Sequence, residues 1–432
     1  MRSQTHLPLH PLRSKVLDEI HARPFEPVRA PAVILRYVFW RNPEIDHRAV
    51  LRDWCKARDF EVPNESDRLF QWKDGSALLT FEAHSEFSSI SWMGDPQHVP
   101  ESDPFTVFGG PPPVLGELIN GLRITVRPFG RASDQLQSED GEPNMLDLHT
   151  FDPGSLCVSK AASGQAIIAT DFRQNEFGLT QFLVVDMGMR AINCGALTRW
   201  LAEIETYRAV ALLGLPEAQR IAPKISALER ELSGIFSDLA SQKTTEENQE
   251  VLDRLYQIAI DLEALAIASQ YRFAASRAYV GIVQQRLEAL EESQHLGYVT
   301  FKTFLERRIA PAIQTCDAME RRQNALSEKI SRASDLLRTQ LDIDLQSQNQ
   351  TLLKALNERS ELQFRLQQTV EGLSVVAISY YAVSLLYYLY RGIPGAAFLG
   401  IEELVALSIP VVILAVWLAI RRVRDRHRDD PG

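Results

Sequence analysis

The stretch GLSVVAISYYAVSLLYYLY, residues 372–390, contains no charged residue. As an α-helix rising about 1.5 Å per residue it would be about 28 Å long, close to the roughly 30 Å hydrocarbon core of a bilayer. A second uncharged stretch, LVALSIPVVILAVWLAI, covers residues 404–420. A pair of buried core helices is the alternative, but helices that are apolar on every side are rare in soluble domains. We therefore predict a hairpin of two transmembrane helices over residues 370–421, with the lipid bilayer as a partner.

Charges beside these stretches predict the orientation of the hairpin. The connecting loop carries the cation Arg391 together with Glu402 and Glu403, whereas the second stretch is followed by five arginines: Arg421, Arg422, Arg424, Arg426 and Arg428. Because cationic flanks tend to stay in the cytosol, residues 422–432 are expected to form a basic cytosolic tail. Residues 1–15 lack the apolar run of a secretory signal. We therefore expect an inner (cytoplasmic) membrane location, with the N-terminal domain and the tail both cytosolic.

Residues 1–190 have the pattern of a mixed α/β domain. Runs that alternate apolar and polar residues, or that are apolar and bounded by glycine, predict strands, and residues 47–59 have the spacing of a helix with one apolar face. The predicted strands are 32–40, 76–84, 86–93, 122–127, 155–159, 165–170 and 179–186, and residues 131–143 are predicted to be a loop. The predicted fold class is α+β.

Near Ala196 the apolar spacing changes from two residues to three and four, which predicts a helical stalk over residues 191–369. Its first helix would end around Gly214-Leu215-Pro216, Pro223 would open the second, and the third would cover 251–296. Pro311 is expected to mark a helix boundary or a kink. Heptad-like spacing follows at Leu326, Ile330, Ala333, Leu337, Leu352, Leu356, Leu366, Val370 and Leu373. This stripe predicts a coiled-coil-like stalk whose partner helices come from the same chain, from further copies in a homo-oligomer, or from both.

Composition argues against several classes of function. A net charge of −10 disfavours a nucleic-acid-binding protein. Four widely separated cysteines favour reduced core thiols over a zinc site or a disulfide framework. The sequence lacks the phosphate-binding loop, the dinucleotide-binding glycines, the nucleophile elbow and the zinc-protease motif. We therefore expect no enzymatic activity, and the sequence assigns no cofactor.

Glu82, His84 and Glu86 are the candidate metal ligands. If residues 82–86 form an unbroken strand, alternation places all three side chains on one face. Two carboxylates and an imidazole there suit a divalent metal or acid–base chemistry, whereas a solvated or hydrogen-bonded sheet face is the alternative. Glu402 and Glu403 are a second candidate, as a loop that concentrates cations. Glu205 and Arg208 are expected to form an ordinary surface pair.

Several motifs are spread along the chain: His21-Ala22-Arg23-Pro24, His84-Ser85-Glu86-Phe87, Asp171-Phe172-Arg173-Gln174 with Gly178-Leu179-Thr180, and Glu203-Ile204-Glu205-Thr206-Tyr207-Arg208 with Ala211-Leu212-Leu213-Gly214-Leu215-Pro216. Together they resemble a bacterial family of uncharacterised membrane-anchored proteins built around a domain of unknown function. The resemblance covers nearly the whole chain. It implies the same architecture, and that family has no assigned activity to transfer.

The predicted architecture is also similar to that of the CorA family of magnesium channels, in which a long helix leads from an α/β domain into the first span. This likeness implies a homopentamer whose first spans line a pore. The family's Gly-Met-Asn signature is absent, because the corresponding residues are Tyr390-Arg391-Gly392-Ile393-Pro394. Arg391 would place a positive charge where a hydrated cation is received.

These observations predict a non-enzymatic, oligomeric binding or scaffold protein that presents its α/β domain to a cytosolic ligand or protein partner. A divergent CorA-like divalent cation channel or transporter is the alternative from the transport class. A metal-dependent enzyme that uses Glu82, His84 and Glu86 is the third hypothesis.

Overall fold

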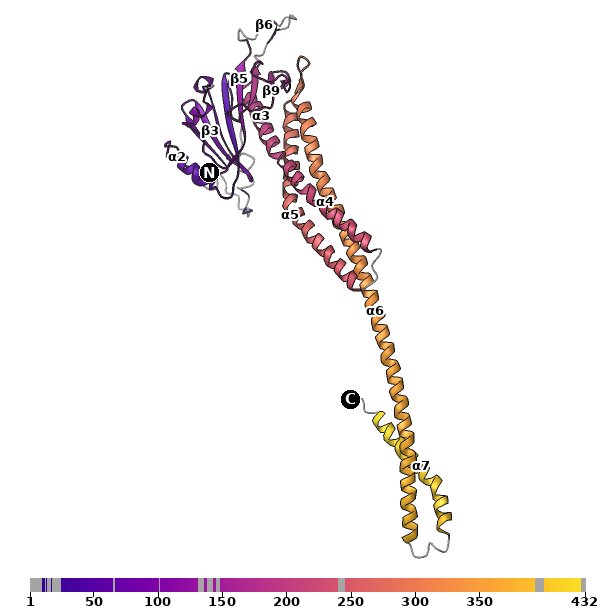
Figure 1. The fold of residues 1–432 in the computed structure, drawn as a ribbon. Helices are drawn as coiled ribbons and strands as arrows, with labels where there is room; N and C mark the ends of the chain where they lie inside the picture. Colours follow the sequence, from indigo (N-terminus) through magenta and orange to yellow (C-terminus); the bar gives the residue numbers. More distant parts are fainter. Residues whose placement is uncertain are drawn as a thin grey trace. The chain divides into compact units, whose positions relative to one another are not determined.

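Two compact units divide the chain. The computed structural model describes residues 10–11, 13, 17, 25–64, 67–100, 102–130, 136–137, 143–144, 148–239, 245–392 and 400–428. The first unit consists of Met1–Ser241 and Asp253–Arg332, and the second of Gln242–Leu252 and Ala333–Gly432. Figure 1 shows the elements of both units. The helical residues from Ala191 to Leu239 and from Asp253 to Arg332 therefore belong to the same unit as the sheet.

A mixed sheet forms the centre of the first unit. Within the described residues it has nine strands in the order β11-β8-β9-β10-β5-β1-β4-β3-β2. Its strands pair antiparallel except β5 and β10, which are parallel. The strands are β1 (Ala32–Trp40), β2 (Leu69–Asp74), β3 (Ala77–Ala83), β4 (Phe87–Gly94), β5 (Glu117–Pro128), β8 (Cys157–Ala161), β9 (Ala166–Thr170), β10 (Thr180–Asp186) and β11 (Ser293–Gln294). The short pair β6 (Leu136–Gln137) and β7 (Pro143–Asn144) lies at the predicted loop, the rest of which is outside the described residues.

Each of the seven predicted strands overlaps an observed strand, because the alternation in the sequence follows the two faces of the sheet; β2 was not predicted. In β1, Val33, Leu35 and Tyr37 belong to the apolar core on one face. Ala32 and Val38 belong to the core on the other face. Arg36 lies between them in the alternation and therefore shares the face of Ala32 and Val38.

Helices cover both faces of the sheet. The helix α3 (Ala191–Ala211) and parts of α5 (Thr245–Ala289) and α6 (Phe301–Gly392) pack on one face through Leu201, Leu287 and Phe301. The opposite face is covered by α2 (His47–Lys56) and the 3-10 helix η2 (Pro104–Phe108); a second 3-10 helix, η1, covers Pro96–His98. Each fully buried leucine or phenylalanine stabilises such a core by about 1.5–3 kcal/mol.

The helix α4 (Gly214–Leu239) begins earlier than predicted. Gly214-Leu215-Pro216, which we expected to end the preceding helix, forms its first turn. Proline is tolerated there because the first amide groups of a helix have no partner inside the helix. Pro223 lies in the helix interior, so the prediction that it opens the helix is wrong.

The helix α6 likewise runs without a break through Pro311, so the expected helix boundary there is wrong. Ile309 and Ala312, on either side of the proline, are both buried. Their packing favours continued helix despite the missing amide donor. Further along α6, Leu326, Ile330, Ala333 and Leu337 are buried, which confirms the apolar face predicted for this part of the helix.

The last part of α6 and the helix α7 (Ile401–Arg428) contain the two uncharged stretches. Both helices are long and apolar enough to cross a membrane. In the described part of the chain almost none of the apolar stretch of α6, and none of that of α7, is buried by other parts of the protein. Residues 393–399 of the predicted connecting loop lie outside the described residues.

Candidate functional site: a polar cleft beside α3

A row of polar side chains crosses the strands β1, β4, β3 and β2. Arg36 is opposite Ser91, Ser91 is opposite Thr80, and Thr80 is opposite Gln71. Residues opposite one another in an antiparallel pair point to the same face. These four residues therefore form one polar row, and they line a cleft on the α3 side of the sheet.

A neighbouring row makes the rest of the floor apolar. Ile34 is opposite Met93, and Met93 is opposite Leu78. The three side chains line the same cleft, which has a volume of about 90 Å³. The floor is therefore polar along one row and apolar along the next.

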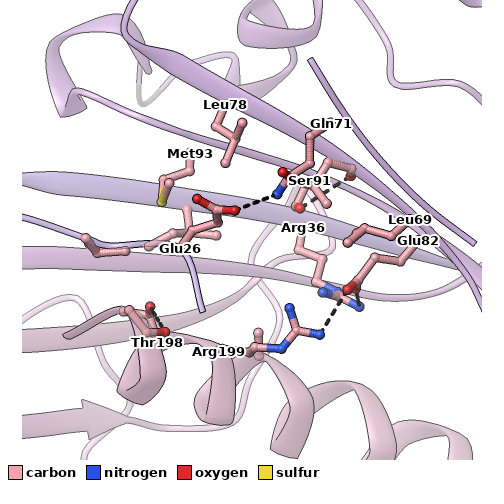
Figure 2. A pocket seen from close by; sticks show the side chains of 15 residues that line it. Glu26, Arg36, Leu69, Gln71, Leu78, Glu82, Ser91, Met93, Thr198 and Arg199 are labelled. Carbon is pink, nitrogen blue, oxygen red and sulfur yellow. Dashed lines mark hydrogen bonds and ion pairs between the residues drawn. The ribbon is translucent and has the colours of Figure 1, made fainter. Parts of the chain in front are cut away.

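The walls of the cleft are α3 and the segment just before β1. Gly195, Thr198 and Arg199 line it from the helix, and Glu26 lines it from the segment. A Cβ atom at Gly195 would lie 1.9 Å from the carbonyl oxygen of Glu26, so this segment rests directly on the helix backbone. The Gln71 amide donates a hydrogen bond to Glu26 Oε1 at 3.1 Å, which fixes the carboxylate above the floor (Figure 2).

Glu82 is buried at the end of the cleft between two arginines. Its Oε2 lies 2.7 Å from Arg36 Nη2, and its Oε1 accepts a hydrogen bond from Arg199 Nη2 at 3.0 Å (Figure 2). Arg36 and Glu82 come from β1 and β3, with β4 between them, and β4 presents only the small side chains of Ser91 and Ser89 beneath the pair. The strand pairing therefore leaves room for a long cation and a carboxylate to meet above the sheet.

The two arginines hold Glu82 in its ionised form. Burial by itself would raise the pKa of Glu82, which is 3% exposed. The positive charges of Arg36 and Arg199 outweigh burial and lower the pKa to about 2 from its ordinary 4.5. The carboxylate is thus charged throughout the physiological range.

The ion pair at Glu82 continues into the helices. Arg199 Nε donates to Glu203 Oε1 at 3.0 Å, and Glu203 Oε2 accepts from Arg286 Nε of α5 at 2.5 Å. This ion-pair chain, Arg36–Glu82–Arg199–Glu203–Arg286, contains three arginines and two glutamates. It links the sheet, α3 and α5 through side-chain charge.

The predicted arrangement of Glu82, His84 and Glu86 on one strand face is wrong. β3 ends at Ala83 and β4 begins at Phe87, so the segment between them reverses direction instead of continuing as a strand. Period-two alternation fits equally well a strand that continues and two strands that meet at a tight turn. The sequence pattern therefore missed the turn.

The structure places these three candidates in separate contacts. Glu82 is held by arginines, whereas Glu86 accepts a hydrogen bond from Tyr279 Oη at 2.5 Å and pairs with Arg272. The His84 ring stacks on Phe87 with ring centroids 4.2 Å apart. Over the described ranges, no three His, Cys, Asp or Glu side chains are placed to hold a metal ion.

A second buried charge cluster surrounds Glu205, which is 0% exposed. Its carboxylate accepts hydrogen bonds from Asn120 Nδ2 at 3.2 Å, Thr180 Oγ1 at 2.8 Å and Arg208 Nε at 2.7 Å. The predicted pairing with Arg208 is confirmed, but its predicted surface location is wrong. The sheet and the other helices cover α3, and polar side chains on the strands satisfy the carboxylate.

The motifs that carry the family resemblance meet around α3. Arg208 lies over the ring of Phe172 at 5.3 Å, and Phe172 stacks on Phe304 of α6 at 5.1 Å. Tyr207 stacks on Tyr279 at 5.6 Å, beside Glu86. The motif His21-Ala22-Arg23-Pro24 lies outside the described residues.

All four cysteines, Cys55, Cys157, Cys194 and Cys316, are buried free thiols, as predicted. The fold and the cleft together define a class: an α+β protein whose mixed sheet carries a charged cleft and whose long helices end in apolar segments. The chain belongs to the family described as "Protein of unknown function (DUF3422)", whose model matches residues 8–427. No curated protein matches the chain.

Proposed function

We propose that this chain is a membrane-anchored, non-enzymatic binding protein of the inner membrane, with its sheet-containing unit in the cytosol. The observation that carries the proposal is the uncovered apolar surface of α6 and α7. Leu385 and Leu407 are 69% and 75% exposed. Each large apolar side chain left in water forgoes about 1.5–3 kcal/mol of burial. A lipid environment recovers this free energy along both helices.

The side chains near the ends of the apolar segments support a hairpin with both ends in the cytosol. Arg421 lies over the ring of Trp417 at 5.1 Å, an arrangement suited to the interface between lipid and water. Tyr387 and Tyr388 lie near the other end of the first apolar stretch, where an aromatic belt would form. The arginines after residue 420 favour the cytosolic side.

Cell fractionation tests the anchor. We expect the full-length protein to sediment with membranes and to stay there through an alkaline carbonate wash, because two apolar spans are solvated by lipid. Protease added to sealed spheroplasts should leave it intact, and protease added to inverted vesicles should cut the sheet-containing unit. Recovery of the protein in the supernatant without detergent would contradict the anchor.

We also propose that copies of the chain associate through α6. Every side chain from residue 345 to 370 is exposed, yet Leu345, Leu352, Leu366 and Leu373 recur at multiples of seven residues. Anchors in one membrane would hold neighbouring copies parallel, the arrangement in which a heptad stripe packs best. Arg359 interrupts the stripe, and a polar residue at such a position typically selects register at some cost in stability.

Light scattering in detergent tests the association. We expect a protein mass that is a multiple of the 48.8 kDa chain. Leu352→Glu should shift the particle toward one chain, because it places like charges inside the stripe. Leu353→Glu is the matched control, since Leu353 is equally exposed (64% against 60%) but lies off the stripe. A wild-type protein with the mass of a single chain would refute association.

A divalent cation channel is the competing proposal, and Glu402 and Glu403 are the observation that favours it. Both side chains are exposed in the first turn of α7, beside an apolar segment. Acidic residues at this position also stabilise the helix dipole, which accounts for them without transport. Liposomes containing the protein and a divalent-sensitive dye decide the question. Flux above that of empty vesicles would favour the channel over the binding protein.

A further inference from the structure

We propose that the cleft beside α3 binds a small zwitterion of the α-amino carboxylate class, with the ligand carboxylate at Arg36 and the ligand ammonium at Glu26. This inference rests on the proposed binding function of the first unit and gives it a ligand. It does not depend on the membrane anchor or on self-association, since every residue that lines the cleft belongs to the first unit.

The ion-pair chain that ends at the floor of the cleft carries a net positive charge. The ion-pair chain has three arginines for two glutamates, and Arg286 is its more exposed end. Arg36, at the other end, is 7% exposed, and its Nε is buried with no hydrogen-bond partner among the described residues. A buried guanidinium with an unused donor is costly unless an acceptor meets it. A ligand carboxylate in the cleft would meet the part of this guanidinium that lines the cleft and add a counter-charge there.

The wall formed by the segment before β1 carries an uncompensated negative charge at Glu26. Glu26 accepts a hydrogen bond from the neutral Gln71 amide, and no cationic side chain in the described ranges forms an ion pair with it. Its backbone is held against Gly195, so the carboxylate stays above the floor instead of swinging to a distant partner. An ammonium group in the cleft would give Glu26 the missing counter-charge.

Size and apolar lining restrict the ligand further. About 90 Å³ is well below the roughly 300–1,000 Å³ of typical cofactor and drug sites, which favours a small ligand over a nucleotide. Ile34, Leu78 and Met93 form an apolar strip beside the polar row. This strip suits a short aliphatic side chain. A ligand with only a carboxylate would be repelled by Glu26, and a ligand with only an ammonium would be repelled by the arginines. A zwitterion can place its carboxylate at Arg36 and its ammonium at Glu26.

The experiment uses the full-length protein purified in detergent and the common L-amino acids as probes, screened by ligand-observed NMR. We expect a small aliphatic amino acid such as L-valine to bind. Isovalerate, which lacks the ammonium, and isobutylamine, which lacks the carboxylate, should each bind about tenfold to a hundredfold more weakly. Equal binding of isovalerate would overturn the ligand class while leaving a binding function in place. Absence of binding by all these probes would overturn the proposed ligand, whereas the membrane anchor and the association through α6 would stand on their own tests.

Two variants tie the binding to the cleft. Glu26→Gln keeps an acceptor for Gln71 and should weaken L-valine binding about tenfold or more, with little effect on isovalerate. Arg36→Lys keeps a counter-charge for Glu82 but removes the planar guanidinium with its several donors, so both ligands should bind more weakly. Glu217→Gln on α4, far along the chain from the cleft residues, is the control and should bind as wild type. Unchanged L-valine affinity in Glu26→Gln would refute the proposed orientation.

Discussion

Glu205→Ala is expected to lower the free energy of unfolding of the first unit by about 3–5 kcal/mol, the cost of removing one partner from a buried ion pair. The variant leaves the Arg208 guanidinium without its counter-charge and the Thr180 hydroxyl without its acceptor. Five of the six tryptophans lie in the first unit, so tryptophan fluorescence during denaturation in detergent reports its unfolding.

Two further variants separate charge from packing at this position. Glu205→Gln retains an acceptor for Thr180, so it should lose less stability than Glu205→Ala. Glu217→Ala removes the same kind of partner from an exposed pair with Arg220, where solvent screening leaves about 0–1 kcal/mol. A loss no larger for Glu205→Ala than for Glu217→Ala would mean that the Glu205 cluster does not stabilise the fold.

Acid should destabilise the first unit through Glu82. The folded-state pKa of about 2 lies below the ordinary 4.5, so the contribution of this carboxylate is complete above pH 4.5 and is lost as pH falls toward 2. The difference between the two pKa values corresponds to about 3 kcal/mol. A pH series of denaturation curves from 7 to 2, followed by tryptophan fluorescence, measures this loss.

The variant Glu82→Gln isolates this effect from other carboxylates. It should be less stable than wild type at pH 7, because Arg36 and Arg199 lose their counter-charge, and the gap between the two proteins should narrow as the pH falls below 4.5. Glu229→Gln is the control, since its pKa is lowered by an exposed hydrogen bond to Arg322 that solvent screens. A wild-type-to-variant gap that is constant from pH 7 to 2 would show that Glu82 is not responsible.

The sequence predicted the strands well because their signal is local. Alternation in 32–40 follows the two faces of a sheet, and both faces of β1 are indeed buried. It predicted helix ends less well where proline was involved. Pro223 and Pro311 disfavour helix locally, but buried neighbours on both sides of each proline maintain it: Ile221 and Ile225, and Ile309 and Ala312.

The cleft was beyond sequence reasoning because its floor depends on strand order. Arg36 and Glu82 are far apart in the sequence and meet only because β4 lies between β1 and β3 with serines beneath the pair. Glu82 was singled out, but as a metal ligand rather than as the counter-ion of two arginines. Glu205 was assigned to the surface because a charged residue in a helix usually lies there. The polar residues Asn120 and Thr180 within strands were the available hint.

The contact at Gly195 has a consequence for selectivity. At Gly195 there is no room for a Cβ atom between the helix and the Glu26 carbonyl, so the backbones of the two walls are in direct contact and set the spacing there. Rotamer changes cannot move these two walls apart, although they can reshape the floor, which is built from side chains. The side of the cleft where the walls meet should therefore be rigid, and adaptation to ligands of different size should come from the floor.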